Sequence, residues 1–203
     1  MCVAALGCIF KPLEGSTIVV CGGAPLIFVA NNYTTMIHIP ELKTSTALTL
    51  FWMRRDLRLV DNCGLYQALK SSEQVLPLFI FDPHILDKLT DRTDRRVQFI
   101  YQQIQVLKAQ LESRGTSMLI CYGKPIEIFE QLTQDHRIAA VYTNHDYEPY
   151  AIQRDQAVKA LLADKQIPFH TFKDQVIFEK EEVMKDNGTP YTVFTPYMKK
   201  WKS

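Results

Sequence analysis

The sequence lacks the local patterns that mark metal-binding, disulfide-linked and phosphate-binding proteins. Its five cysteines are odd in number and include no CxxC pair, so neither a zinc site nor a disulfide framework is predicted. No GxGxxG or Walker arrangement is present, so a phosphate-binding glycine loop is not expected. No Ser/His/Asp arrangement or nucleophile elbow occurs either. We therefore expect no metal and no self-contained catalytic site in this chain.

The sequence also lacks a large excess of positive or negative charge, and it lacks long apolar runs. The formal net charge of +1 gives no large basic surface of the kind that neutralises nucleic-acid phosphates. The one membrane-like stretch, Ile18–Ala30, is interrupted by Gly22, Gly23 and Pro25 and is too short to span a bilayer. The first cation, Lys11, follows an apolar start, so no secretory signal is predicted. We expect a soluble cytoplasmic protein with reduced thiols and no membrane partner.

Composition changes near residue 45. Residues 1–45 hold only four charged side chains and show neither helical periodicity nor strand alternation. We expect an N-terminal extension over residues 1–45 that lies outside the fold and is poorly ordered. Translation that begins later, for example at Met36, is an open alternative. The folded domain is predicted to span residues 46–175.

From residue 46 onward, apolar runs alternate with segments of helical periodicity. The predicted strands are Leu48–Met53, Val75–Phe81, Ser117–Tyr122, Ala139–Asn144 and Phe169–Phe172. Helices are predicted between them. The first covers residues 62–71, the second runs from a cap at Thr93 or Asp94 to just before Gly115, the third from Pro125 to about Gln134, and the fourth from Pro149 to about Ala163. Strands and helices at this spacing imply right-handed crossovers. The predicted fold is a doubly wound, Rossmann-like α/β domain whose five-stranded parallel sheet has helices on both faces.

Two of these elements carry finer predictions. The helix before Gly115 should be capped by Thr93 or Asp94, and spacings of three and four should place on its buried face Val97, Ile100, Ile104, Leu107 and Leu111. Pro77 lies inside the second strand and cannot donate to the ladder. The firm part of that strand is therefore predicted as Leu78–Phe81.

Ligands of doubly wound folds lie beyond the carboxyl ends of the strands. The loop Arg54–Asn62 is rich in arginine and aspartate, and an internal ion-pair network is favoured over an anion site. Phe79–His84 and Asn144–Tyr150 mix aromatic rings with carboxylates. Such a mixture suits a planar heteroaromatic ligand, but core rings and helix-capping carboxylates explain it equally well. No specific role is predicted for His84 or His145.

These segments resemble the DNA photolyase/cryptochrome family. The matching blocks are Phe51–Asn62 (FWMRRDLRLVDN), Leu78–Pro83 (LFIFDP), Asn144–Tyr150 (NHDYEPY) with Arg154-Asp155, and Gly188–Trp201 (GTPYTVFTPYMKKW). They follow the family's order over roughly residues 47–201. The resemblance implies the N-terminal α/β domain of a deoxyribodipyrimidine photolyase, which in this family binds an auxiliary light-harvesting chromophore or none.

In this family a separate C-terminal helical domain binds FAD and repairs DNA with pyrimidine dimers. Because the chain ends at Ser203, the resemblance implies a fragment without catalytic residues of its own, in which residues 176–203 begin the interdomain connection. Aromatic surface near Tyr191–Tyr197 would then be uncovered, so the fragment is expected to self-associate. A fragment of a sensory cryptochrome is one alternative. An independent nucleotide-binding α/β domain is another, although it should show the missing glycine loop.

The resemblance also suggests which chromophore is bound. Members that bind methenyltetrahydrofolate carry an Asn-Glu pair where this chain has Tyr150 and Ala151. The loop 144–150 is similar to that of members that bind 8-hydroxy-deazaflavin, so a deazaflavin or a flavin is favoured. The cofactor-binding residues implied by the resemblance are Arg55, Phe79, Phe81, Asp82, Arg96, Asp146 and Glu148.

Overall fold

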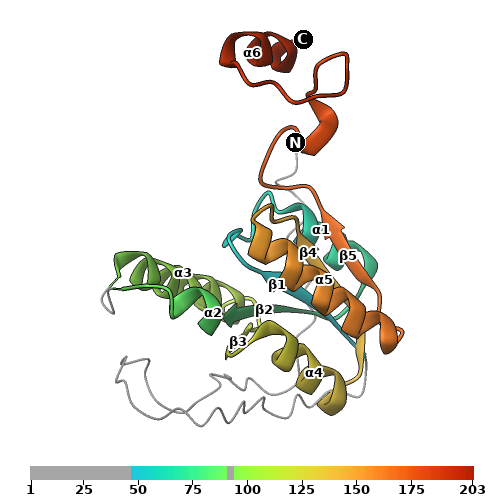
Figure 1. Ribbon diagram of the computed structural model, residues 1–203. Coiled ribbons are helices and arrows are strands. Elements are labelled where there is room, and N and C mark those ends of the chain that lie inside the picture. The colour runs from blue at the N-terminus through green and yellow to red at the C-terminus, as the bar shows by residue number, and fades with distance from the viewer. Residues whose placement is uncertain (1–46, 91–93) are drawn as a thin grey trace.

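The computed structural model describes residues 47–90 and 94–203, which build a parallel sheet between two helical layers (Figure 1). The strands are β1 (Leu48–Met53), β2 (Val75–Phe81), β3 (Leu119–Tyr122), β4 (Ile138–Asn144) and β5 (Phe169–Phe172). The helices are α1 (Cys63–Ser71), α2 (Pro83–Leu86), α3 (Arg95–Glu112), α4 (Pro125–Asp135), α5 (Pro149–Asp164), the 3-10 helix η1 (Lys180–Glu182) and α6 (Phe194–Lys202). The sheet order β3-β2-β1-β4-β5, with every pair parallel, confirms the predicted doubly wound fold.

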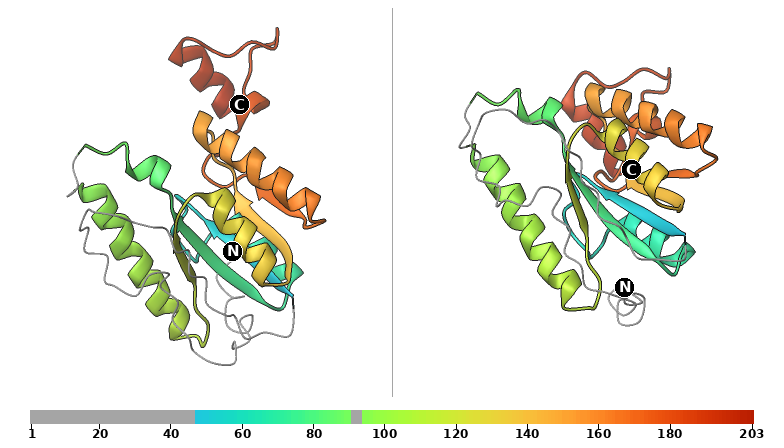
Figure 2. Two further views of the ribbon diagram at one scale, coloured as in Figure 1. Left: turned by 60° about the horizontal axis from the view of Figure 1, so that its bottom comes forward. Right: turned by 90° about the horizontal axis from the view of Figure 1, so that it is seen from below.

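The two faces of the sheet are covered by different helices, because successive strand side chains point to opposite sides. Phe51 and Met53 of β1 pack with α1 and α3 on one face. Leu50 and Trp52 pack with α4 and α5 on the other, where the rings of Trp52 and Phe129 meet edge to face at 5.0 Å. Figure 2 shows α3 and the α4–α5 pair on opposite sides of the sheet. Since both faces are covered, every residue of β1 is buried.

The second strand has its predicted bounds, and only the restriction of its firm part to Leu78–Phe81 was wrong. β2 is continuous over Val75–Phe81, and Pro77 lies opposite Phe51 of β1. On its other side β2 pairs with β3 only from Leu78 onward. A residue without an N–H is therefore accommodated where β3 supplies no partner. The same register explains why β3 begins at Leu119, two residues later than predicted.

The third helix is capped by Asp94; the alternative cap, Thr93, and the expected extension 1–45 lie outside the described residues. Only part of its predicted apolar face is buried. Ile104, Leu107 and Leu111 reach the core, whereas Val97 and Ile100 are half-buried. The first half of α3 therefore faces a space that the sheet does not fill.

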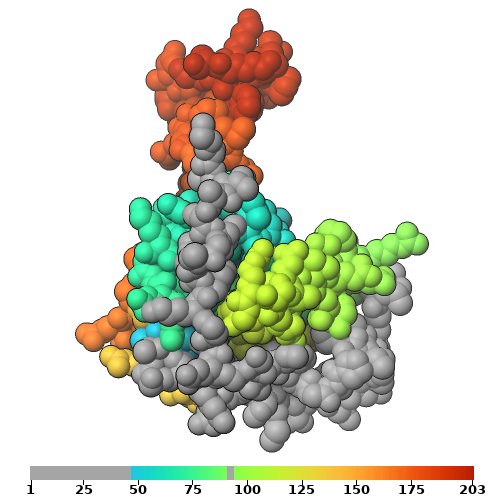
Figure 3. Space-filling model, turned by 180° about the vertical axis from the view of Figure 1, so that it is seen from behind, coloured from blue at the N-terminus to red at the C-terminus, as the bar shows by residue number. Residues whose placement is uncertain are grey.

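The chain after β5 leaves the sheet and ends in α6, an element that the sequence analysis did not predict. Figures 1 and 3 show this C-terminal segment projecting beyond the α/β layers. None of the residues of α6 is buried. Across the described residues, no helix is long and apolar enough to cross a membrane.

Candidate functional site

A buried network of amide and carboxylate groups joins the carboxyl ends of β1 and β4, where the crossovers diverge to opposite faces. Asn144, the last residue of β4, donates to Asp56 Oδ2 at 2.6 Å and to Asn62 Oδ1 at 2.9 Å. Its own Oδ1 accepts the Gly64 N–H at 2.8 Å. Asn62 caps α1 by accepting the Leu65 N–H at 3.1 Å. These groups satisfy one another, so the network stabilises the fold rather than offering groups to a ligand.

The arginines after β1 lie on either side of this network. Arg58 pairs with Asp174 at 2.7 Å and Arg54, which is nearly buried, pairs with Asp155 of α5. The arginines are ion-paired as the sequence favoured, but their partners are carboxylates outside the loop and not Asp56 or Asp61, so the prediction of a network internal to the loop was wrong. Arg55 differs, because its side chain is half-exposed and turns toward a neighbouring cavity.

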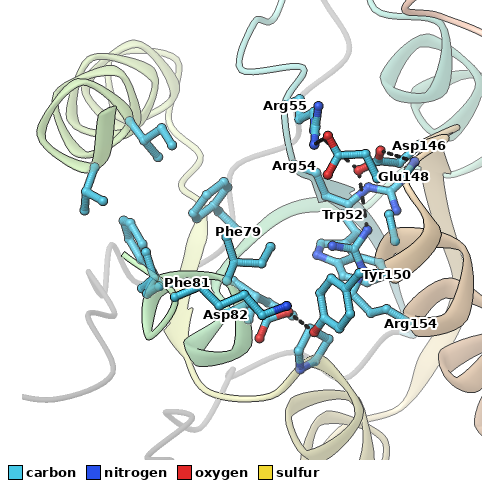
Figure 4. Close-up of a pocket in the computed structure, with 18 of the residues that line it drawn as sticks. Trp52, Arg54, Arg55, Phe79, Phe81, Asp82, Asp146, Glu148, Tyr150 and Arg154 are labelled. Atoms are coloured by element: carbon cyan, nitrogen blue, oxygen red, sulfur yellow. Dashed lines mark hydrogen bonds and ion pairs between the residues drawn. The ribbon is translucent and has the colours of Figure 1, made fainter. Parts of the chain in front are cut away.

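This cavity, of about 610 Å³, lies beyond the carboxyl ends of β1, β2 and β4 (Figure 4). The structure brings to it all seven residues that the resemblance implied: Arg55, Phe79, Phe81, Asp82, Arg96, Asp146 and Glu148. The sequence analysis did not assign to this site Trp52, Arg54, Ile85, Lys88, Val97, Ile100, Tyr150 or Arg154, which also line it. Val97 and Ile100 of α3 come from a segment whose sequence pattern is only that of an ordinary helix, whereas Tyr150 and Arg154 stand in a block that matches the family and could have been assigned from it.

One side of the cavity is apolar. The rings of Phe79 and Phe81 meet edge to face, with centroids 5.0 Å apart at an interplanar angle of 74°. Val97 and Ile100 of α3 and Ile85 of α2 add aliphatic surface. Figure 4 shows the two phenylalanines across the cavity from Arg54 and Arg55. Apolar walls that face a few polar groups are typical of sites for flat organic ligands.

The opposite side is formed by ion pairs. Arg55 Nη2 lies 2.5 Å from Glu148 Oε1, and Arg55 Nε lies 3.6 Å from Asp146 Oδ2. Asp146 is nearly buried and also lies 3.8 Å from Arg154 Nη2. The hydrogen bond to Glu148 outweighs partial burial and raises the pKa of Arg55. Because Arg55 and Glu148 are both largely exposed, either can turn to a ligand at little cost.

The floor of the cavity is a tryptophan whose ring contacts two arginines. The guanidinium carbons of Arg54 and Arg154 lie 5.1 Å and 4.9 Å from the ring centroid of Trp52. Both arginine side chains are nearly buried and paired with Asp155. Such cation–π contacts, together with the ion pairs, fix the indole in place.

The sequence left open whether Asp82 and Asp146 cap helices, and the structure gives a different answer for each. Asp82 caps α2, because its Oδ1 accepts the His84 N–H at 2.9 Å. Its Oδ2 accepts the hydroxyl of Tyr150; burial and this hydrogen bond raise the pKa of Tyr150. Asp146 lies 3.4 Å from the Glu148 N–H, while α5 has no side-chain cap. Its main partners are the arginines.

Arg96 lies at the rim, where its side chain is 76% exposed. It pairs with Asp94 at 2.6 Å, and this hydrogen bond lowers the pKa of Asp94 to about 2. Because the Arg96 side chain is exposed, it can turn to a ligand at the cost of its bonds to Asp94 alone.

The loop between β4 and α5 also faces away from the cavity. His145 Nδ1 and the Tyr147 hydroxyl both contact Glu179 Oε1, the former at 2.5 Å. Burial opposes ionisation of Glu179, but the hydrogen bonds from Tyr147 and His145 lower its pKa overall. Burial and the bond to Glu179 raise the pKa of Tyr147. The loop thus connects the cavity side to the chain that follows β5.

Comparison with known proteins places this geometry in a family. A family model described as DNA photolyase matches residues 49–203. A deoxyribodipyrimidine photo-lyase from Synechococcus sp. PCC 6301 is 37% identical over 154 residues, which are 76% of this chain and 32% of that protein.

Two solved structures have the same fold over most of the described residues. A class III photolyase from Agrobacterium tumefaciens superposes with a TM-score of 0.66 and 26% identity, over 75% of this chain and 31% of that one. An archaeal photolyase from Sulfolobus tokodaii, described with two FAD molecules, superposes with a TM-score of 0.58 and 27% identity, over 66% of this chain and 32% of that one. The chain spans about a third of the length of these relatives. Because the match begins within β1 and runs through every later element described above, the chain belongs to the DNA photolyase family.

Proposed function

We propose that the cavity holds a planar light-absorbing chromophore of the flavin or 8-hydroxy-deazaflavin type, which serves as an antenna. The observation that carries this proposal is the contrast between its two sides, apolar around Phe79 and Phe81 and ionic around Arg55 and Glu148. A tricyclic ring can stack against the apolar side while its polar edge faces the ionic groups. Light harvesting needs a fixed position and orientation, which the clamped floor at Trp52 supports.

The residues present fit a flavin-type ring better than methenyltetrahydrofolate. At position 150 the tyrosine hydroxyl is already donated to Asp82, and Ala151 is buried and has no polar side-chain atom. Neither position offers the amide and carboxylate of the folate-binding members. The Sulfolobus tokodaii photolyase is described with two FAD molecules and with a novel light-harvesting cofactor implied by them, which supports a flavin as one candidate class.

We further propose that this domain works within a protein that repairs pyrimidine dimers in DNA in a light-dependent manner. The support is the similarity to a deoxyribodipyrimidine photo-lyase of which the matched residues make up 32%. On this proposal, residues 176–203 begin the connection to a helical domain that holds FAD and the DNA site. The exposed apolar side chains of that segment, among them Val193 and Phe194, would otherwise favour self-association.

A binding titration tests the chromophore proposal. The purified chain is titrated into riboflavin, 8-hydroxy-5-deazaflavin and methenyltetrahydrofolate, and fluorescence anisotropy is recorded. We expect the first two ligands to bind with dissociation constants of about 1–10 μM, on the order of −7 to −8 kcal/mol, and the folate at least about tenfold more weakly. Tighter binding of the folate would reverse the assignment of the chromophore, and no binding of any of the three would remove the proposal.

A matched pair of variants locates the ligand. Val97→Arg places a long side chain in the cavity from the half-buried face of α3. Val106→Arg makes the same change on the exposed surface of the same helix. Only the first should abolish binding. Equal loss in both variants would show that the ligand binds elsewhere or that α3 has been disturbed.

A further inference from the structure

The short helix α2 forms one end of the cavity but has little packing of its own. It comprises only Pro83–Leu86, and none of its residues is buried. Ile85 is 46% exposed, yet Ile85 and Leu86 both line the cavity. An isolated turn of this length is not stable in water. Contacts from outside the helix must therefore hold this wall in position.

Tyr150, in the first turn of α5, makes three such contacts. Its hydroxyl donates to Asp82, the N-cap of α2, as Figure 4 shows. Its ring stacks on that of His84, with centroids 4.3 Å apart at an interplanar angle of 22°. Lys88 Nζ lies 5.5 Å from the same ring centroid. Each of the three partners belongs to the segment 82–88, so one side chain joins α5 to the whole α2 turn.

We infer that Tyr150 is a positioning residue that holds α2 against α5, closes this end of the cavity and so sets its affinity for a flat ligand. The effect on affinity rests on the proposed chromophore function; the hold on α2 does not. The hydroxyl supplies a hydrogen bond to a carboxylate that is 5% exposed, where water competes poorly. Without this bond the ring can still stack on His84, but α2 loses its connection through Asp82.

Tyr147, in the loop just before α5, provides a matched control. It is also a half-buried tyrosine whose hydroxyl donates to a carboxylate, that of Glu179. It does not line the cavity. Tyr147→Phe and Tyr150→Phe therefore make the same chemical change, and only the second acts on α2.

Hydrogen exchange in the ligand-free chain tests the hold on α2. The N–H groups of Ile85, Leu86 and Asp87 are hydrogen-bonded within this turn. In a peptide that covers the segment they should exchange about tenfold faster in Tyr150→Phe, the factor expected for losing one charge-assisted bond, and unchanged in Tyr147→Phe. Asp82→Asn, which keeps an acceptor oxygen, should give an intermediate rate, and adding it to Tyr150→Phe should give no further increase. Equal rates in the wild type and Tyr150→Phe, or multiplied rates in the double variant, would overturn the inference.

Riboflavin titration of the same proteins tests the consequence for binding. The dissociation constant should rise about tenfold in Tyr150→Phe and stay unchanged in Tyr147→Phe. If the wild type binds and Tyr150→Phe binds equally well, the inferred control of affinity is wrong. If no protein binds riboflavin but exchange at α2 still responds to Tyr150→Phe, the proposed ligand is wrong while the hold on α2 is supported. Circular dichroism confirms that each variant is folded.

Discussion

At Gly64 a single missing atom determines whether the buried network can form. A Cβ built there would lie 2.6 Å from Asn144 Oδ1 and 2.9 Å from a ring carbon of Phe51. Neither neighbour can move freely, because Asn144 is bonded to Asp56 and Asn62 and Phe51 is fully buried. The close approach of α1 to β4 therefore requires glycine.

We predict that Gly64→Ala lowers the free energy of unfolding by about 3 kcal/mol, through overpacking and loss of the Asn144 contact. Urea denaturation measures it. Gly188→Ala is the control. Gly188 has open space around it, so its φ of +77° is the sole obstacle to a side chain there. Its cost should be about 1 kcal/mol, from backbone strain alone. A Gly64→Ala cost no greater than the control would mean that helix and strand can separate freely.

The two tyrosines that donate to carboxylates predict an alkaline limit to stability. Burial and their acceptors raise the pKa of both Tyr147 and Tyr150 above the ordinary value of about 10. Folding therefore favours the neutral phenols. Their contribution is complete below about pH 10 and is lost as pH rises through the raised values.

We predict that the unfolding free energy of the wild type falls more steeply above pH 10 than that of Tyr147→Phe/Tyr150→Phe. Urea midpoints at intervals from pH 8 to 12 give both curves. At pH 8 the double variant should be the less stable protein. Parallel curves across the alkaline range would show that these phenols titrate as they do in the unfolded chain.

At the scale of elements, local pattern predicted the strands far better than the site. β1, β2 and β5 were predicted with their observed bounds, because apolar runs of this length between polar loops suit buried strands. The start of β3 depended on its register with β2, which the sequence of a single strand does not contain. α2 is too short to show periodicity.

The residues of α3 that line the cavity illustrate why part of the site was not predicted. Val97 and Ile100 follow the same apolar spacing as Leu107 and Leu111, so the sequence shows which face turns inward. It does not show whether the sheet or a ligand fills the space in front of it. The structure shows that the sheet meets the second half of the helix and that the first half lines the cavity.

Glu179 fixes the segment after β5 to the loop after β4, and this contact can be tested on its own. It accepts from Tyr147 and His145, and it forms a capping box with Glu182 at η1. We predict that Glu179→Gln makes the bonds after Lys173 and Lys180 several times more sensitive to trypsin, while the core is unaffected. The control is Glu181→Gln, the same change at an exposed glutamate two residues further along the chain. Equal cleavage rates in both variants would mean that Glu179 does not hold this segment.

At the scale of the whole molecule, apolar surface is concentrated on the segment that projects from the α/β layers. Its side chains more than a third exposed are Val176, Ile177, Phe178, Val193, Phe194, Tyr197 and Trp201. Phe178 and Trp201 contact each other edge to face at 5.7 Å, but the outer face of α6 stays open. Exposed apolar surface of this kind favours association.

We predict that residues 1–203 self-associate as concentration rises, and that Phe194→Ser shifts the equilibrium toward monomer. Sedimentation velocity over a concentration series measures the distribution. Phe99→Ser, the same change at an exposed site on α3, should leave it unchanged. A monomeric wild type at all concentrations would contradict the prediction.

The loop between β4 and α5 alternates between two sides, and its length is constrained as a result. His145 and Tyr147 turn toward Glu179, while Asp146 and Glu148 turn toward Arg55. Inserting or deleting one residue would exchange the two sets. A histidine and a tyrosine would then face the cavity, and two carboxylates would lie beside the carboxylate of Glu179. A single substitution in this loop therefore acts on one side only, whereas any change in its length alters the ligand site and the C-terminal anchor in one step.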